Sequence, residues 1–247
     1  MKRLICALLA GVMCAAAAFS FAGCGCNKSK NNNGENDGQK QNGYVMPTTQ
    51  PDLKDDNFGF YIINSSELML TRYYGSDNEV TIPSTFRDYT VTTIGHSVFH
   101  TAKVEKITVP DTITEIQDYA FASNTRLKEV KLSENLRVLG TNVFFSCPNL
   151  ETVELPASIE KIDAYTFCGA GIKSISFPES KTFTALSQYM FFQCPELKEV
   201  TIPVTITTIP DNCFEQCPAD MVIKAYEDSY ALGFAKSHNI KYEVIPR

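Results

Sequence analysis

Short runs of alternating hydrophobic and polar residues recur along most of the chain. In the stretch 127–132, Val130 and Leu132 alternate with Glu129 and Lys131. Because side chains alternate between the two faces of a strand, this order buries the aliphatic residues and exposes the charged ones. Several of these runs end in proline, which cannot donate a ladder hydrogen bond and therefore stops pairing. The pattern predicts a series of short strands that each bury one face.

A second periodic signal lies between these strands. An aliphatic residue precedes a phenylalanine by five positions at Ile94/Phe99, Ile116/Phe121, Leu139/Phe144, Ile162/Phe167, Leu186/Phe191 and Ile209/Phe214. Successive aliphatic positions are 22, 23, 23, 24 and 23 residues apart, and the similar strings "CPNLETVELP" and "CPELKEVTIP" are 47 residues apart, which is two periods. A fixed period of roughly 20 to 29 residues is typical of a leucine-rich-repeat solenoid, in which each unit buries its apolar face against its neighbours.

The remaining segments complete one coil. The β-branched stretch "TITEI" (112–116) predicts a second, shorter strand. The stretch "QDYAFASN" (117–124) spaces Ala, Tyr and Phe as in one helical turn, with the phenylalanine filling the core. We therefore predict an α/β solenoid, a leucine-rich repeat of about six 23-residue coils, each consisting of strand, short strand and helical turn.

Both ends of the solenoid need a cover, because an open end exposes core and unpaired backbone. Two strand-like runs within Phe58–Tyr74 are separated by Ser-Ser and predict a hairpin-like N-terminal β cap. Near the other end, Asp228 or Ser229 offers a helix N-cap, an apolar stripe follows, and Asn239 is a stop signal before a last strand. This order predicts a C-terminal helix–strand cap.

The repeat unit, written "LxxVxLPxxIxxIxxxAFxxCxxL", resembles the BspA-like leucine-rich repeats of bacterial surface proteins. The resemblance covers Phe58 to Ile245 and recurs six times with matching spacing. It implies a non-enzymatic, cell-surface interaction domain, often one that adheres to host or neighbouring-cell proteins, and it transfers no catalytic residue. Most relatives hold Cys three positions after the phenylalanine, but Ala102, Asn124 and Ala170 stand there in this chain, which indicates that the thiol is not chemically required.

The N-terminal segment has the features of a targeting signal. Lys2 and Arg3 precede a long apolar stretch, Leu4 to Ala22, as in a secretory signal peptide, although its length also permits a membrane-spanning helix. The string "SFAGC" resembles the bacterial lipobox, with Phe21 where leucine is usual, and this resemblance makes Cys24 the lipidated residue. We predict a signal peptide over residues 1–23 and an extracytoplasmic protein, lipid-anchored to the bacterial cell membrane.

Composition changes abruptly after the expected cleavage site. Residues 24–57 are dominated by Asn, Lys, Gly, Gln and Asp, which bury too little apolar surface to offset the entropy of ordering. They predict a disordered linker between the lipid and a folded domain over residues 58–247. The formal net charge of −6 argues against a nucleic-acid or anionic-membrane surface.

The cysteines invite a redox or metal interpretation. Cys147, Cys194 and Cys217 each follow the repeat phenylalanine by three residues, Cys168 follows it directly and Cys213 precedes it, so we expect small buried apolar side chains. Cys194 and Cys217 lie in adjacent coils, within reach of a disulfide in principle. Cys213 and Cys217 have no histidine nearby, which argues against zinc.

Other motifs give no catalytic or metal site. His96 and His100 in "HSVFH" superficially match a zinc-binding helix, but the glutamate and the third ligand are missing. The stretch "GAGIKS" (169–174) lacks the spacing of a phosphate-binding loop, and no nucleophile motif occurs. We expect no catalytic residue, no metal and no cofactor.

Two surfaces are candidates for partner binding. One is the outward face of the main strands, where Lys106, Glu129, Lys131, Glu154 and Glu199 lie, and the other is a column of Tyr119, Tyr165 and Tyr189, interrupted by Asn142. Adjacent strands place Lys106 beside Glu129 and Lys131 beside Glu154. Small hydroxyl side chains and the absence of tryptophan suit an extended polypeptide better than a stacked sugar ring.

These features together predict a cell-surface lipoprotein whose solenoid binds a macromolecular partner, a surface or extracellular protein, with adhesion or host and neighbour-cell interaction as the role. The membrane is contacted through the N-terminal lipid, and nucleic acid is not a partner. Two alternatives stay open: a structural envelope spacer without a specific ligand, and a surface hydrolase.

Overall fold

The computed structural model describes residues 40–41, 44–45 and 50–246, which belong to one compact unit, 38–247. The expected signal peptide (1–23), the expected lipidation site Cys24 and most of the expected linker lie outside the described residues. Strands β1 (Lys40–Gln41) and β2 (Tyr44–Val45) form a short antiparallel pair.

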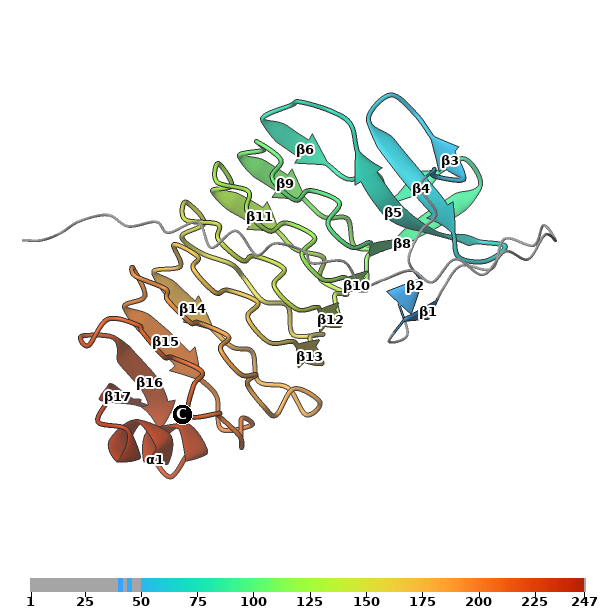
Figure 1. Ribbon diagram of the computed structural model, residues 1–247. Coiled ribbons are helices and arrows are strands. Elements are labelled where there is room, and N and C mark those ends of the chain that lie inside the picture. The colour runs from blue at the N-terminus through green and yellow to red at the C-terminus, as the bar shows by residue number, and fades with distance from the viewer. Residues whose placement is uncertain (1–39, 42–43, 46–49, 247) are drawn as a thin grey trace, which may run out of the picture. The chain divides into compact units, whose positions relative to one another are not determined.

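Parallel strands follow one another along one face of the stack, the strand face (Figure 1). The first sheet consists of β6 (Glu79–Thr81), β9 (Lys106–Thr108) and β11 (Glu129–Lys131). The second consists of β14 (Ser174–Ser176), β15 (Glu199–Ile202), β16 (Val222–Tyr226) and β17 (Lys241–Ile245). In the coil between these two sheets, Thr152 forms only an isolated bridge to Ser174.

Short strands make a second face, as predicted from the β-branched segments. They are β8 (Tyr89–Ile94), β10 (Glu115–Ile116), β12 (Val138–Leu139) and β13 (Lys161–Ile162). Their parallel register aligns Ile94 with Ile116, Leu139 and Ile162, which is the predicted aliphatic column. The 23-residue period therefore sets the register, because each coil presents its aliphatic residue at the same height.

The predicted hairpin is present at the N-terminal end. Strands β4 (Phe58–Ile62) and β5 (Glu67–Tyr73) pair antiparallel, and β5 pairs in parallel with β8. A further strand, β7 (Thr85–Phe86), pairs antiparallel with β8.

Ordered structure begins before residue 58, the predicted start of the folded domain. Strand β3 (Leu53–Lys54) pairs antiparallel with β4, and the Asp55 carboxylate accepts hydrogen bonds from the backbone N–H groups of Asn57 and Phe58. Residues 53–58 are thus held against β4 by backbone pairing and side-chain bonds, and the division into linker and folded domain stays a prediction.

The third side of each coil is a run of tight turns, and the predicted helical turn is wrong. In the stretch 117–124, Tyr119 has φ 58° and Ser123 has φ 56°, whereas a helix needs negative φ throughout. The N–H groups of Tyr119, Phe121 and Ser123 donate to carbonyls of the next coil, those of Thr141, Val143 and Phe145, at 2.7–3.1 Å. We call this side the turn face.

Left-handed residues recur in two columns on the turn face. One column contains Ser97, Tyr119, Asn142, Tyr165 and Tyr189, and the other contains Thr101, Ser123, Ser146, Gly169, Gln193 and Gln216. Positive φ is uncommon outside glycine. Its recurrence shows that bonding between coils, which fixes these turns, outweighs the local preference of each residue.

The predicted phenylalanine column forms the core. Phe99, Phe121, Phe144, Phe167, Phe191 and Phe214 follow one another with ring centroids 5.4–5.6 Å apart. Phe144 and Phe167 are fully buried, and their rings are only 5° from parallel. Burying one such side chain contributes about 1.5–3 kcal/mol, and each aromatic contact adds about 0.5–1.5 kcal/mol.

The C-terminal segment contains α1 (Tyr230–Ser237), the one helix among the described residues. Ser229, one of the two predicted N-caps, accepts a hydrogen bond on its hydroxyl from the N–H of Leu232 at 3.2 Å. The helix ends at the C-cap His238, and Asn239 follows with φ 54° before β17 begins. In the part of the chain that the structure describes, no helix is both long and apolar enough to cross a bilayer.

The architecture is thus a β-solenoid of about eight turns, in which the six predicted repeats are the regular part. It differs from the predicted α/β solenoid because the third segment of each coil is a run of tight turns whose alternate N–H groups donate to the next coil. The function of the terminal elements as caps stays a prediction.

Candidate functional site on the strand face

The outward residues of the first sheet stand in the predicted columns. The parallel register aligns Glu79 with Lys106 and Glu129, and it aligns Thr81 with Thr108 and Lys131. The Lys106 Nζ lies 2.8 Å from the Glu129 Oε1. This hydrogen bond to Glu129 raises the pKa of Lys106 above its ordinary value.

The second sheet repeats this arrangement nearer the C-terminus. Ser174 aligns with Glu199, and the Lys224 Nζ forms an ion pair with the Glu199 Oε1 at 2.9 Å. Lys224 also lies 3.6 Å from Glu243 on β17, and the hydrogen bond to Glu199 is the main reason why the pKa of Lys224 is raised. The predicted residue Glu199 is therefore already engaged within the strand face.

Between the two sheets the strand face is interrupted. The N–H of Glu129 donates to the carbonyl of Glu105, and the carbonyl of Lys131 accepts from the N–H of Val109, on either side of β9. Val130 therefore directs its backbone groups toward the next coil. Among the described residues, no backbone hydrogen bond joins 129–132 to 151–155, whereas every other neighbouring pair on this face is linked by a ladder or a bridge. Val130 and Thr152 thus face each other without bonding.

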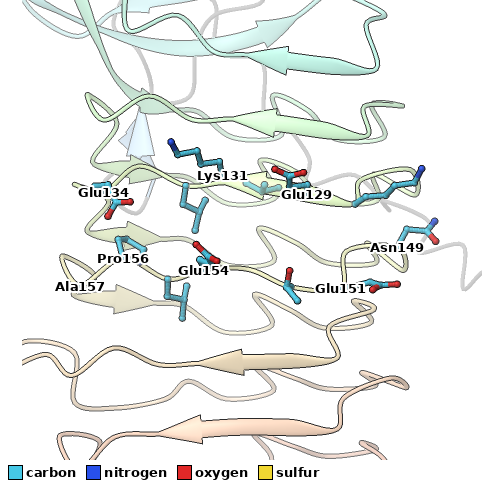
Figure 2. Close-up of a pocket in the computed structure, with 13 residues that line it drawn as sticks. Glu129, Lys131, Glu134, Asn149, Glu151, Glu154, Pro156 and Ala157 are labelled. Carbon is cyan, nitrogen blue, oxygen red and sulfur yellow. The ribbon is translucent and has the colours of Figure 1, made fainter.

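A groove of about 900 Å³ lies at this interruption, and we call it the inter-sheet groove (Figure 2). Its lining residues are Lys128, Glu129, Val130, Lys131, Leu132, Glu134, Asn149, Glu151, Thr152, Glu154, Leu155, Pro156 and Ala157. Figure 2 shows Glu129 and Lys131 on one coil and Glu151 and Glu154 on the neighbouring one. Val130 and Leu132 are buried at its base.

Only some of the charges around the inter-sheet groove are paired. Glu129 bonds to Lys106, Glu151 bonds to Lys173 at 2.6 Å, and Lys128 bonds to Glu105 at 2.9 Å. The bond from Lys128, assisted by Arg126, holds the pKa of Glu105 below its usual value. In the described structure the side chains of Lys131, Glu134 and Glu154 make no ion pair and no hydrogen bond.

The predicted tyrosine column lies on the turn face, away from the inter-sheet groove. Tyr165 and Tyr189 stack with centroids 4.8 Å apart and rings 11° from parallel. Tyr119 instead contacts the ring of His96 at 5.6 Å, and the intervening Asn142 is buried. The column is therefore two separate aromatic patches rather than a continuous ridge. The pKa of Tyr165 is raised mainly by desolvation, and the neighbouring Tyr189 adds to this effect.

The repeat cysteines have a structural role. The thiols of Cys147, Cys194 and Cys217 each donate to the carbonyl of the phenylalanine in the preceding coil, those of Phe121, Phe167 and Phe191, at 3.0–3.3 Å. Cys147, Cys194 and Cys213 are fully buried, as expected for packing residues. All five cysteines among the described residues are free thiols, so Cys194 and Cys217 form no disulfide here.

Burial also makes these thiols poor nucleophiles. It raises the pKa of Cys147 to about 12 and that of Cys168 and Cys217 to about 11, and it raises the pKa of Cys194 and Cys213 as well. Because the thiolate is the reactive form, such thiols are inert near neutral pH.

The histidines and the glycine-rich stretch fall in ordinary parts of the repeat. His96 and His100 are exposed on the turn face. Gly169 has φ 66° in a repeat turn, and Ser174 begins β14. No three His, Cys, Asp or Glu residues are grouped to hold a metal ion anywhere in the described ranges.

Sequence reasoning missed Glu134, Glu151 and Asn149 as lining residues, and it missed the interruption itself. Val153 and Leu155 keep the inward spacing of every other rung. The composition of the strand therefore gave no signal that pairing stops there.

Comparisons with known proteins address the repeats directly. The family model of the "BspA type Leucine rich repeat region" matches residues 92–219 in six copies. Among curated proteins, none matches the chain.

Solved structures share the fold. A "leucine rich cell surface protein" from Faecalibacterium prausnitzii is 27% identical with a TM-score of 0.60, and the match covers 72% of this chain and 52% of that one. The T. pallidum leucine-rich repeat protein is 20% identical with a TM-score of 0.66, covering 79% and 99%. The pneumococcal vaccine antigen PcpA is 21% identical with a TM-score of 0.50, covering 72% and 51%. The chain thus spans about half the length of the Faecalibacterium protein.

Proposed function

The chain belongs to the BspA-type leucine-rich repeat family, and from that premise we propose that its strand face binds a protein partner at the bacterial cell surface. Proteins of this family are generally non-enzymatic scaffolds with protein-binding or surface roles. The Faecalibacterium relative is described as a cell surface protein, which supports the same location for this chain.

The observation that carries this proposal is the regular outward surface of the strand face. The interior is filled by stacked phenylalanines, so a partner has to be recognised from outside. Thr108 and Ser176 point outward beside charged residues, and the parallel register keeps such side chains in line from one coil to the next. A line of small hydroxyls and charges suits a polypeptide surface with matching hydrogen-bonding groups.

The proposed location depends on the N-terminal segment. Acylation of Cys24 would tether the solenoid outside the membrane, and two acyl chains give stable anchoring because each buried CH₂ contributes about 0.8 kcal/mol. A protein with adhesive function then projects its strand face toward neighbouring or host cells.

Site-specific photo-crosslinking tests the proposal. A photoreactive residue replaces Thr108 or Thr201 on the strand face, and Ser123 or Gln216 on the turn face as a matched control. On intact cells that carry the protein, mixed with neighbouring or host cells, we expect saturable cross-linking to one protein from the strand-face positions only. Saturable capture from the turn face alone moves the site toward Tyr165 and Tyr189. Capture from neither face contradicts partner binding and favours a structural spacer.

A further inference from the structure

Two unpaired backbone edges face each other across the inter-sheet groove. Val130 directs its N–H and carbonyl groups into the groove from one side, and Thr152 does so from the other, because Glu151 accepts its bond from the coil that follows. An unpaired strand edge is a template for the addition of another extended segment. The groove therefore offers main-chain donors and acceptors as well as side chains.

The opening is confined to the strand face. On the inner side, the rings of Phe121 and Phe144 lie 5.4 Å apart, and those of Phe144 and Phe167 lie 5.6 Å apart, as elsewhere in the stack. Toward the second face, the Ser158 hydroxyl donates to the carbonyl of Leu136 at 2.7 Å and joins the same two coils. The interruption is thus a local feature between coils that are otherwise held together.

The charges without partners indicate what the groove attracts. Four glutamates and two lysines line it. Glu129, Glu151 and Lys128 are paired with residues outside the groove. Among the described lining residues, the groups without a partner are two carboxylates, those of Glu134 and Glu154, and one ammonium group, that of Lys131. An acidic excess in a groove with exposed main-chain groups favours a basic, extended ligand.

We propose that the inter-sheet groove binds an extended lysine- or arginine-bearing segment of the partner protein. The segment lies along β11, hydrogen-bonds the free backbone groups of Val130 and Thr152, and places basic side chains on Glu134 and Glu154. The groove volume of about 900 Å³ lies within the usual range of about 300–1,000 Å³ for ligand sites. This inference rests on the proposed function and names the chemistry of the partner that it requires.

Binding of synthetic peptides to the purified full-length chain tests the inference by fluorescence anisotropy. The probe is a short dye-labelled peptide of alternating lysine and threonine. One comparison peptide replaces each lysine by glutamate, and the other keeps the lysines but carries N-methyl groups on alternate amides, which removes main-chain donors. We expect saturable binding of the lysine peptide alone.

Matched variants locate the site on the protein. Glu134→Gln and Glu154→Gln each remove a free carboxylate from the groove, and Glu79→Gln removes an exposed carboxylate on the same face two strands away. All three side chains are exposed, so the variants keep the core intact. Each groove variant weakens the lysine peptide about two- to fivefold, and Glu79→Gln leaves it unchanged.

Three results overturn the inference. They are no saturable binding of the lysine peptide, equal binding of the N-methylated peptide, and equal weakening by Glu79→Gln, which would show attraction to the whole face. Photo-crosslinking from Thr108 and Thr201 is read separately from peptide binding. If a partner is captured there while the peptide result is negative, the strand-face function stands and the groove assignment falls.

Discussion

Lys106 on β9 bonds to Glu129 on β11 at 2.8 Å, across a continuous parallel ladder. One rung further, Lys131 and Glu154 occupy the corresponding places on adjacent coils, yet they form no ion pair in the described structure. The first pair is exposed, so it contributes only about 0–1 kcal/mol to stability. The contrast shows where the ladder ends and where charged groups are left available to a partner.

Replacement of a core phenylalanine tests the stacked interior. Phe144→Ala removes a fully buried ring between Phe121 and Phe167, so we expect the free energy of unfolding to fall by about 3–5 kcal/mol. The adjacent Phe145 is half-buried outside the ring column, and Phe145→Ala should cost less than half as much. Urea denaturation followed by circular dichroism measures both. Equal losses of unfolding free energy in the two variants would contradict the conclusion that the phenylalanine column forms the core.

Phe86 lies outside the phenylalanine column but packs at its N-terminal end. Its ring stacks on Phe60 at 4.6 Å, and it packs against the core from β7. We therefore expect Phe86→Ala to cost more than a surface change, because the loss of Phe60 packing adds to the loss of its own burial.

Two glycines of one coil should respond differently to alanine. A Cβ on Gly171 would overlap the carbonyl oxygen of Pro148 in the preceding coil. Gly171→Ala therefore pushes the backbones of these two coils apart and should lower the free energy of unfolding by about 3 kcal/mol. Gly169 has φ 66° but room for a methyl group beside Ser146, so Gly169→Ala should cost only about 1–2 kcal/mol. Thermal unfolding of the two variants gives the order, and the reverse order would contradict the close contact of these coils.

Buried thiols make stability fall at alkaline pH. The pKa of Cys147 is raised to about 12 in the folded protein, and an unfolded thiol titrates near about 8.5. As the pH rises, the thiol loses its proton in the unfolded chain before it does so in the folded protein, and this favours unfolding. The contribution of the protonated Cys147 thiol to the free energy of unfolding is therefore complete below about pH 8.5 and is lost as the pH rises toward 12. Near pH 10 the loss should be roughly 2 kcal/mol for this thiol.

The variant Cys147→Ala isolates that effect. Its urea midpoint should fall less between about pH 8 and pH 10 than that of the unchanged protein, because one linked proton is removed. All other ionisable groups are the same in the two proteins, so their contributions cancel in the comparison. Identical pH dependence would show that the Cys147 thiol is not desolvated.

Membrane attachment should depend on Cys24. Cys24→Ser removes the residue expected to carry lipid, so the solenoid should appear in the soluble fraction, while the unchanged chain partitions with membranes after cleavage. Fractionation and intact-mass measurement give both answers. If both proteins stay in the membrane fraction as uncleaved chains, the segment 4–22 spans the membrane instead.

The sequence predicts the repeat register well because two independent periods agree. Alternation fixes which side of a strand is buried, and the recurrence from Ile94 to Ile162 fixes which residues lie at the same height. The phenylalanine column follows from the same period and needs no knowledge of neighbouring coils.

The turn face and the inter-sheet groove are decided by contacts between coils, which residue types alone do not reveal. The stretch 117–124 spaces Ala, Tyr and Phe as in one helical turn, but the N–H groups of Tyr119 and Phe121 donate to the next coil, and this bonding replaces the helix. At the groove, Val153 has the same strand pattern as Val130, so the lost pairing depends on how two similar coils meet. The strand face was thus predictable, while its interruption was not.

Amide hydrogen exchange, resolved by residue with NMR, tests the interrupted strand face as a partner-binding groove most directly. In the free protein, the amides of Val130 and Thr152 should exchange rapidly because no backbone carbonyl accepts them, whereas Ile107, within the first sheet, should be protected. The lysine–threonine peptide should slow Val130 and Thr152 and leave Ile107 unchanged. Protection of Val130 and Thr152 in the free protein, or exchange that the bound peptide does not slow, would contradict the groove and its proposed occupant.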